Sequence, residues 1–133
     1  KAPDVRIKMP SGRHLCYFNP RLMAKVGAGK TAHGNRDRVW AQFVKEQEHR
    51  SVYGGLVTEN LIQAIARDLF IEGQVRLIKA GYKVRLTAHD EYVISAPKGT
   101  GIAPIQEIVH ILPEWAKGLP LGTEGTVGER YSK

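Results

Sequence analysis

The feature that most constrains the fold of this 133-residue chain is a long apolar periodicity between Thr58 and Ala80. Thr58 is a typical helix N-cap residue, and Gly81 follows the last apolar position as a typical C-terminal stop. We therefore predict a helix over residues 58–80 with one wide apolar face. Its apolar residues recur at the three- and four-residue spacing of a helix, at Leu61, Ile62, Ile65, Ala66, Leu69, Phe70, Leu77 and Ile78.

Two β-rich runs follow this helix and meet at His89-Asp90-Glu91. Alternation of apolar and polar residues before this point, and the aromatic and β-branched residues after it, predict a hairpin over residues 82–97. Asp90 then lies at or beside the tip, where a rigid sheet can present a carboxylate to a metal ion. Asp is also a common turn former, and strand alternation directs Asp90 and Glu91 to opposite faces. A second carboxylate would have to come from elsewhere.

The remaining elements are predicted from shorter patterns. Residues 1–20 read as an N-terminal hairpin, which Asn19-Pro20 should end because proline has no amide hydrogen for a strand ladder. Residues 24–31 nearly match a phosphate-binding loop, but the sequence indicates neither the strand before them nor the helix after them that such a loop needs, so we predict a basic surface turn. The C-terminal helix and tail occupy residues 102–133. Within the rest we expect a strand at 38–45, a helix at 103–112 and a last strand at 121–127.

The charge of the chain is unevenly distributed. The net charge is +7, and residues 1–50 carry all of it, with 11 Lys and Arg against 4 Asp and Glu. Such asymmetry favours contact with a polyanion such as nucleic acid. A basic, solvated surface without a partner is the alternative.

Composition excludes several classes of protein. The single cysteine, Cys16, rules out an internal disulfide framework, and the five histidines show no paired zinc-ligand spacing. No apolar run approaches the length of about 20 residues that spans a bilayer. We therefore expect no membrane contact and a reducing, cytoplasmic location.

A polar stripe follows another face of the predicted helix. Asn60, Gln63, Arg67 and Gln74 fall at steps of three, four and seven. Uncharged amides beside an arginine are suited to the polar edges in a nucleic-acid groove. An ordinary solvated helix face would show the same stripe.

Four segments together resemble a known family. They are Met9-Pro10-Ser11-Gly12-Arg13, the block from Tyr53 to Asp68, His89-Asp90-Glu91, and the block from Pro113 to Pro120. In this order they resemble the C-terminal palm region of family A DNA polymerases, the bacterial polymerase I class, and most closely its phage-encoded members. The resemblance covers nearly the whole chain. It implies an α+β fold, with an antiparallel palm-type sheet, a long helix packed on one face and a metal-site hairpin.

The resemblance also implies a reaction and its site. The reaction would be template-directed nucleotidyl transfer in DNA replication, with primer-template DNA and deoxynucleoside triphosphates as substrates and two Mg²⁺ ions as cofactors. Asp90 would be one of two essential metal-binding aspartates, His89 would lie near the primer terminus, and Glu91 would support the site. Gln63 would contact the minor groove beside the new base pair. Asn60, Arg67 and His89 complete the expected DNA-binding set.

Other parts of the family pattern are not found in these residues. The first motif, which supplies the other metal-binding aspartate, and the fingers helix are absent from the sequence. We therefore expect a C-terminal fragment or split-gene product of a phage-type polymerase, acting in a bacterial or phage-infected cell. It would hold half of the Mg²⁺ site and be inactive without the rest of the polymerase polypeptide.

Two other functions stay open at this point. A DNA-binding module without catalysis would explain the basic first part and the amide stripe. An independent metal-dependent nuclease would need a second carboxylate near Asp90, for which Glu59, Asp68 and Glu91 are the nearby candidates.

Overall fold

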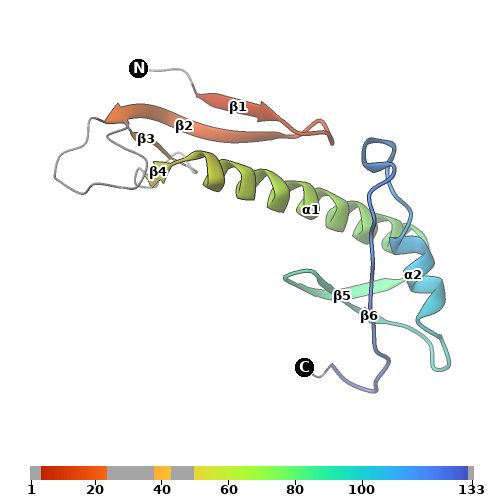
Figure 1. Ribbon diagram of the computed structural model, residues 1–133. Coiled ribbons are helices and arrows are strands. Elements are labelled where there is room, and N and C mark those ends of the chain that lie inside the picture. Colours follow the sequence, from red (N-terminus) through yellow and green to blue (C-terminus); the bar gives the residue numbers. More distant parts are fainter. Residues whose placement is uncertain (1–3, 24–37, 43–49, 132–133) are drawn as a thin grey trace. The chain divides into compact units, whose positions relative to one another are not determined.

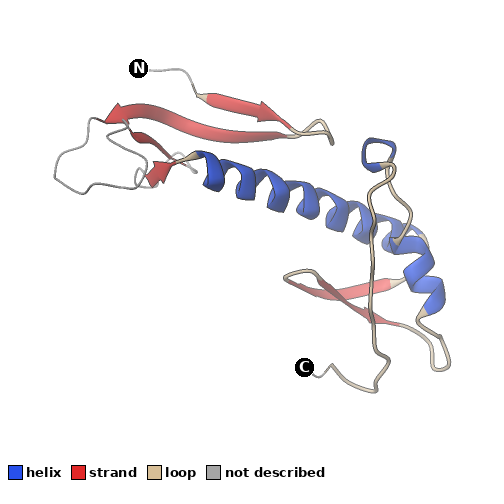
Figure 2. Cartoon of the chain, in the orientation of Figure 1, coloured by secondary structure: helices blue, strands red, loops and turns tan. Residues whose placement is uncertain are grey.

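A computed structural model describes residues 4–23, 38–42 and 50–131. The chain divides into two compact units, Lys1–Ala64 and Ile65–Lys133, and the boundary falls inside the long helix α1 (Gly54–Lys79). Helices and antiparallel strands both contribute, which confirms the α+β class (Figures 1 and 2). The basic turn predicted at 24–31 and the end of the strand predicted at 38–45 lie outside the described residues.

The first unit contains a four-stranded antiparallel sheet whose strands pair in chain order. Its predicted N-terminal hairpin is confirmed, because Lys8 pairs with His14 and Val5 with Tyr17. The turn closes where the Met9 amide donates to the Arg13 carbonyl at 2.7 Å. The four strands are β1 (Val5–Lys8), β2 (His14–Met23), β3 (Arg38–Gln42) and β4 (Arg50–Val52).

The predicted strand end at Asn19-Pro20 is wrong. Strand β2 continues to Met23, and its register with β3 shifts between Phe18 and Arg21. A bulge at this point leaves an extra residue outside the ladder, so the missing amide hydrogen of Pro20 costs no strand hydrogen bond. Asn19 adopts a left-handed φ of 46°, and its backbone N–H donates to Asp4 Oδ1 at 3.0 Å.

Helix α1 begins at Gly54, four residues before the predicted start. Thr58 is therefore inside the helix and is not its N-cap. Its hydroxyl donates to the Gly54 carbonyl at 3.0 Å, which satisfies the side chain within the helix. The predicted C-terminal stop is confirmed: Gly81 has φ 89°, and the amides of Gly81 and Tyr82 donate to the carbonyls of Ile78 and Leu77. This pair of hydrogen bonds is a Schellman motif.

The second unit carries the hairpin of β5 (Lys83–Ala88) and β6 (Glu91–Ser95), which forms a sheet of its own beside the C-terminal half of α1. Helix α2 (Ala103–Val109) and the short 3₁₀ helix η1 (Glu114–Ala116) follow. The core of this unit takes one or two residues from each helix: Leu69 and Leu77 from α1, Val109 from α2 and Ala116 from η1.

The strand predicted at 121–127 is wrong, since these described residues form no strand. Gly122 and Gly125 interrupt the segment, and glycine is depleted in strands. The Thr123 carbonyl instead accepts a hydrogen bond from Gln106 Nε2 at 2.9 Å, so α2 holds this segment through a side chain. No helix in the described ranges is long and apolar enough to span a membrane.

Candidate active-site hairpin

The tip of the β5-β6 hairpin is a two-residue turn. Ala88 pairs with Glu91, which leaves His89 and Asp90 between the strands. His89 has φ 52°, and Asp90 is not among the residues with positive φ, the pattern of a type II′ turn. Both turn side chains are exposed, and the described part of the chain gives Asp90 no hydrogen-bond or ion-pair partner. The fold thus presents a carboxylate to solvent, as predicted from the hairpin pattern.

His89 occupies a backbone conformation in which glycine would be less strained. A residue with a Cβ in the left-handed region costs about 1–2 kcal/mol. Strained positions of this kind occur preferentially at functional sites. The turn geometry alone therefore does not explain why histidine stands at this position.

Glu91 follows Asp90 and begins strand β6. Its neighbour Tyr92 contacts α1, so strand alternation directs Glu91 away from that helix. Glu91 Oε2 accepts a hydrogen bond from the Tyr131 hydroxyl at 3.0 Å, and this bond raises the pKa of Tyr131. Across the described ranges, no three His, Cys, Asp or Glu side chains gather as a metal-binding group.

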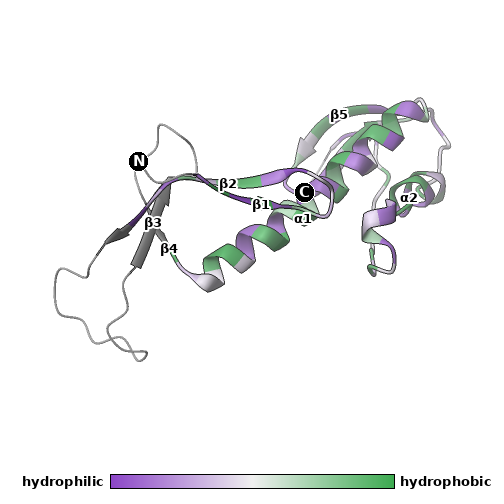
Figure 3. Ribbon diagram, turned by 90° about the horizontal axis from the view of Figure 1, so that it is seen from above, coloured by the Kyte–Doolittle hydropathy of each residue, from purple (hydrophilic) through white to green (hydrophobic). Residues whose placement is uncertain are grey.

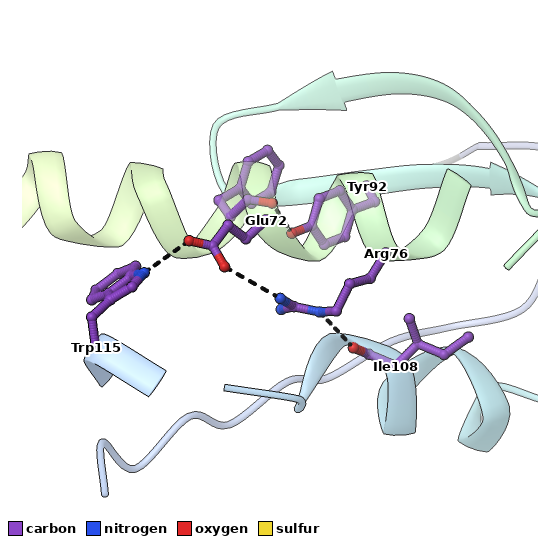
Figure 4. A network of polar contacts seen from close by, with 6 residues as sticks. Glu72, Arg76, Tyr92, Ile108 and Trp115 are labelled. Atoms are coloured by element: carbon purple, nitrogen blue, oxygen red, sulfur yellow. Dashed lines mark hydrogen bonds and ion pairs between the residues drawn. The ribbon is translucent and has the colours of Figure 1, made fainter. Parts of the chain in front are cut away.

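Tyr92 fixes the hairpin on the helix. Its hydroxyl donates to the Phe70 carbonyl at 2.6 Å, and its ring stacks on the Phe70 ring with centroids 4.2 Å apart (Figure 4). Burial raises the pKa of Tyr92, although Arg76 and Arg67 act in the opposite direction. Because Tyr92 is two residues from Asp90, this contact anchors the strand that leads from the tip.

A second network holds α2 and η1 on the same helix (Figure 4). Arg76 Nε donates to the Ile108 carbonyl at 3.2 Å, and its guanidinium pairs with Glu72 at 3.6 Å. Trp115 Nε1 donates to the other Glu72 oxygen at 2.9 Å. These contacts link α1, α2 and η1 within the second unit.

The predicted DNA-contacting side chains of α1 have different surroundings. Asn60 is half-buried, and its side-chain Nδ2 donates to the Tyr17 hydroxyl at 3.1 Å. This hydrogen bond links α1 to β2 within the first unit. Gln63 is exposed and donates to Glu59 at 3.1 Å. Arg67 is exposed and lies 5.3 Å from the centre of the Phe70 ring, within cation-π range. Gln63 and Arg67 remain accessible to a ligand.

Three contributors to this site carry little signal in the sequence. The first is Gly73, where a Cβ would lie 2.6 Å from the Tyr92 hydroxyl oxygen. A glycine in the middle of a helical pattern usually has a packing reason, so Gly73 was the best available sign of this contact. Tyr92 reads as an ordinary strand residue. Nothing in the local pattern of the tail connects Tyr131 to Glu91.

Comparison with known proteins relates the chain to a segment of phage DNA polymerases. It is 35% identical over 132 residues to the DNA polymerase of Bacillus phage SP02, a match that covers 96% of this chain and 19% of that protein. It is also 35% identical over 72 residues to the DNA polymerase of Mycobacterium phage L5, covering 53% of this chain and 12% of that protein. The chain thus spans less than a fifth of the length of these relatives. No protein-family profile matches it, and no solved structure does.

Proposed function

We propose that this chain is the part of a family A, phage-type DNA polymerase palm that carries the metal-binding hairpin. The observation that carries the proposal is the exposed Asp90 carboxylate at a tip anchored on α1, in a chain 35% identical to a segment of the SP02 polymerase. The activity would be DNA-directed nucleotidyl transfer inside a bacterial or phage-infected cell.

The donor chemistry at the tip suits one part of a Mg²⁺ site. Magnesium prefers oxygen ligands and often uses only one or two protein carboxylates, with water and substrate phosphates as the other ligands. Asp90 would be the ligand from this chain. When bound, the two ions would favour ionisation of the primer hydroxyl and neutralise charge on the triphosphate. Because the family's first motif is absent from this sequence, the second aspartate would come from the rest of the polymerase.

The other residues would bind and orient the DNA. His89 would lie against the primer terminus, and Glu91 would support the tip through its bond to Tyr131. Gln63 and Arg67 would contact primer-template DNA, whose minor groove presents similar acceptors in all base pairs. Asn60 would contribute less directly, because its amide is engaged with Tyr17.

A primer-extension assay tests this proposal. Labelled primer-template, Mg²⁺ and deoxynucleoside triphosphates are supplied to the chain alone, to SP02 polymerase lacking the matched segment, and to the two together. A chimera in which this chain replaces the matched segment provides the same test in one polypeptide. Asp90→Asn removes the charge of the proposed ligand. Glu107→Gln is the matched control, since Glu107 is also an exposed carboxylate of the second unit.

The expected result is extension only in the complemented mixture or the chimera. Loss of a metal-binding carboxylate should reduce the rate by several orders of magnitude, because the two-metal arrangement supplies much of the transition-state stabilisation. Glu107→Gln should extend normally. Equal extension by Asp90→Asn and the unmodified chain would refute the catalytic role of the hairpin.

The alternative is a DNA-binding module without catalysis. It is favoured by the net charge of +7, all of it within residues 1–50. This alternative predicts DNA binding that is the same in Mg²⁺ and in EDTA and that is unaffected by Asp90→Asn, without extension in any mixture. Fluorescence anisotropy of labelled primer-template in the two buffers distinguishes the two functions.

A further inference from the structure

The C-terminal half of α1 is apolar on two opposite sides. One side is buried within the second unit and includes Leu69, Gly73 and Leu77. The other side, which we name the outer face, consists of Ile71, Val75 and Ile78, with exposed fractions of 39%, 42% and 55%. Their spacing of four and three residues places them on one stripe, about half a turn from the buried residues.

The outer face is unusual for a surface helix. A helix at the surface of a complete globular protein normally carries charged and polar residues on the side away from the core, whereas a helix that is apolar all round is buried. Figure 3 shows apolar positions recurring along successive turns of α1. The hairpin, α2 and η1 contact the opposite side, through Tyr92, Val109 and Trp115. On α1, the outer face is therefore an exposed apolar stripe that lies beside the polar residues Arg67 and Gln74.

We propose that the outer face docks against an apolar surface of the polymerase polypeptide that lies beyond the segment matched here. This inference rests on the proposed function. The matched segment is 19% of the SP02 polymerase, so about four fifths of that polypeptide is available to cover the face. The match covers 96% of this chain, so the outer face lies within it.

The small size of the face favours this occupant over a second copy of the chain. A stable interface between separate molecules buries about 1,200 Å² or more. Three aliphatic side chains on two turns of helix supply only a small part of such an area. Within one polypeptide the contact needs far less area, because the connection gives the two surfaces a high effective concentration.

Cysteine labelling tests whether the face is covered. Val75→Cys places a thiol on the outer face, and Ile111→Cys is the matched control, because Ile111 is an exposed aliphatic residue of the same unit after α2. Maleimide labelling is followed by peptide mass spectrometry, which distinguishes each introduced thiol from that of Cys16. Labelling is measured in the 133-residue chain, in the mixture with the truncated SP02 polymerase, and in the chimera.

The two introduced thiols should label at similar rates in the chain alone. In the chimera or the mixture, labelling of the Val75→Cys variant should slow by about tenfold or more, as expected for a site that reacts only through transient opening. Labelling of the Ile111→Cys variant should not slow. An unprotected thiol at position 75 in both assemblies would overturn the proposal. Protection in the chain alone that increases with its concentration would also overturn it, in favour of self-association.

Activity measurements separate this proposal from the proposed function. A Val75→Cys chimera whose thiol is protected but which does not extend primers would retain the docking face and refute the polymerase proposal. A Val75→Cys chimera that extends primers while its thiol stays fully reactive would refute the docking proposal and retain the polymerase proposal.

Discussion

At the scale of single residues, the contact between Gly73 and Tyr92 decides how the hairpin sits on its helix. Glycine in a helix interior costs about 1 kcal/mol relative to alanine. A Cβ at position 73 would, however, lie 2.6 Å from the Tyr92 hydroxyl oxygen, and 3.6 Å from the ring carbon that carries it. A side chain at position 73 would thus clash with the Tyr92 hydroxyl oxygen. A hydrogen bond to the Phe70 carbonyl holds that oxygen in place.

We expect Gly73→Ala to destabilise the second unit by about 1 kcal/mol, despite the better helix propensity of alanine. Displacing the hydroxyl loses a hydrogen bond of about 1 kcal/mol and disturbs an aromatic stack of similar value. In a Tyr92→Phe background the same substitution should become neutral or stabilising, because the clashing oxygen is gone. Urea unfolding of the four proteins measures the coupling, expected at about 2 kcal/mol. Additive effects would contradict the close contact.

The stability conferred by Tyr92 should depend on alkaline pH. Burial raises its pKa in the folded chain above the ordinary value of about 10. A raised folded-state pKa means that the contribution is fully present below pH 10 and is lost as the pH rises through the folded-state pKa. The difference in urea midpoint between the unmodified chain and Tyr92→Phe should therefore shrink as the pH rises above about 10. A difference that stays constant would show that the pKa of Tyr92 is the same in the folded and the unfolded chain.

At the scale of elements, the end of α1 sets the direction of the chain into β5. Gly81 has φ 89°, and nothing lies within 4 Å of the position of a Cβ there. Any cost of a larger residue would thus come from backbone conformation and not from packing. This allows the contribution of the helix stop to be measured separately.

Gly81→Ala should lower the free energy of unfolding by about 1 kcal/mol, the penalty for a Cβ in the left-handed region. Gly81→Asn is the control, because asparagine tolerates this conformation better and should cost distinctly less. Thermal or urea unfolding followed by circular dichroism gives both values. Equal losses for the two variants would indicate that the helix does not end in the Schellman motif.

At the scale of the whole molecule, charge rather than shape gives the clearest expectation. Residues 1–50 carry 11 Lys and Arg and the entire net charge of +7. Each cation that contacts a DNA phosphate contributes about −0.9 to the slope of log affinity against log salt concentration. If about five of these cations make such contacts, affinity should fall by roughly 10²–10³ between 50 and 200 mM salt.

Paired substitutions locate this contribution. Arg6→Gln with Lys8→Gln removes two exposed charges from β1 and should reduce the slope by up to about 1.8. The control, Lys98→Gln with Lys117→Gln, removes two exposed charges from the second unit and should leave the slope nearly unchanged. Fluorescence anisotropy at several salt concentrations measures both. A larger change from the control pair would place the DNA-binding surface in the second unit.

The sequence by itself determined the features that local physics encodes. Alternation and turn chemistry specified both hairpins, and the apolar periodicity with Gly81 specified the long helix and its end. The exposed position of Asp90 follows from the hairpin alone, because a turn residue has no strand partner. Thr58 shows the limit of such signals, since a good capping residue is equally satisfied one turn inside a helix.

Only the tertiary structure decided which distant residues meet. Tyr92 donates a hydrogen bond to Phe70, which lies 22 residues away in the sequence, and Trp115 donates one to Glu72, which lies 43 residues away. No local pattern specifies such partners, because each donor could be satisfied by many acceptors and the choice depends on how the whole unit packs. The same reason applies to the apolar residues of α1: Leu69 and Leu77 are buried whereas Ile71, Val75 and Ile78 are exposed, and the packing of the hairpin, α2 and η1 determined which of them the second unit buries.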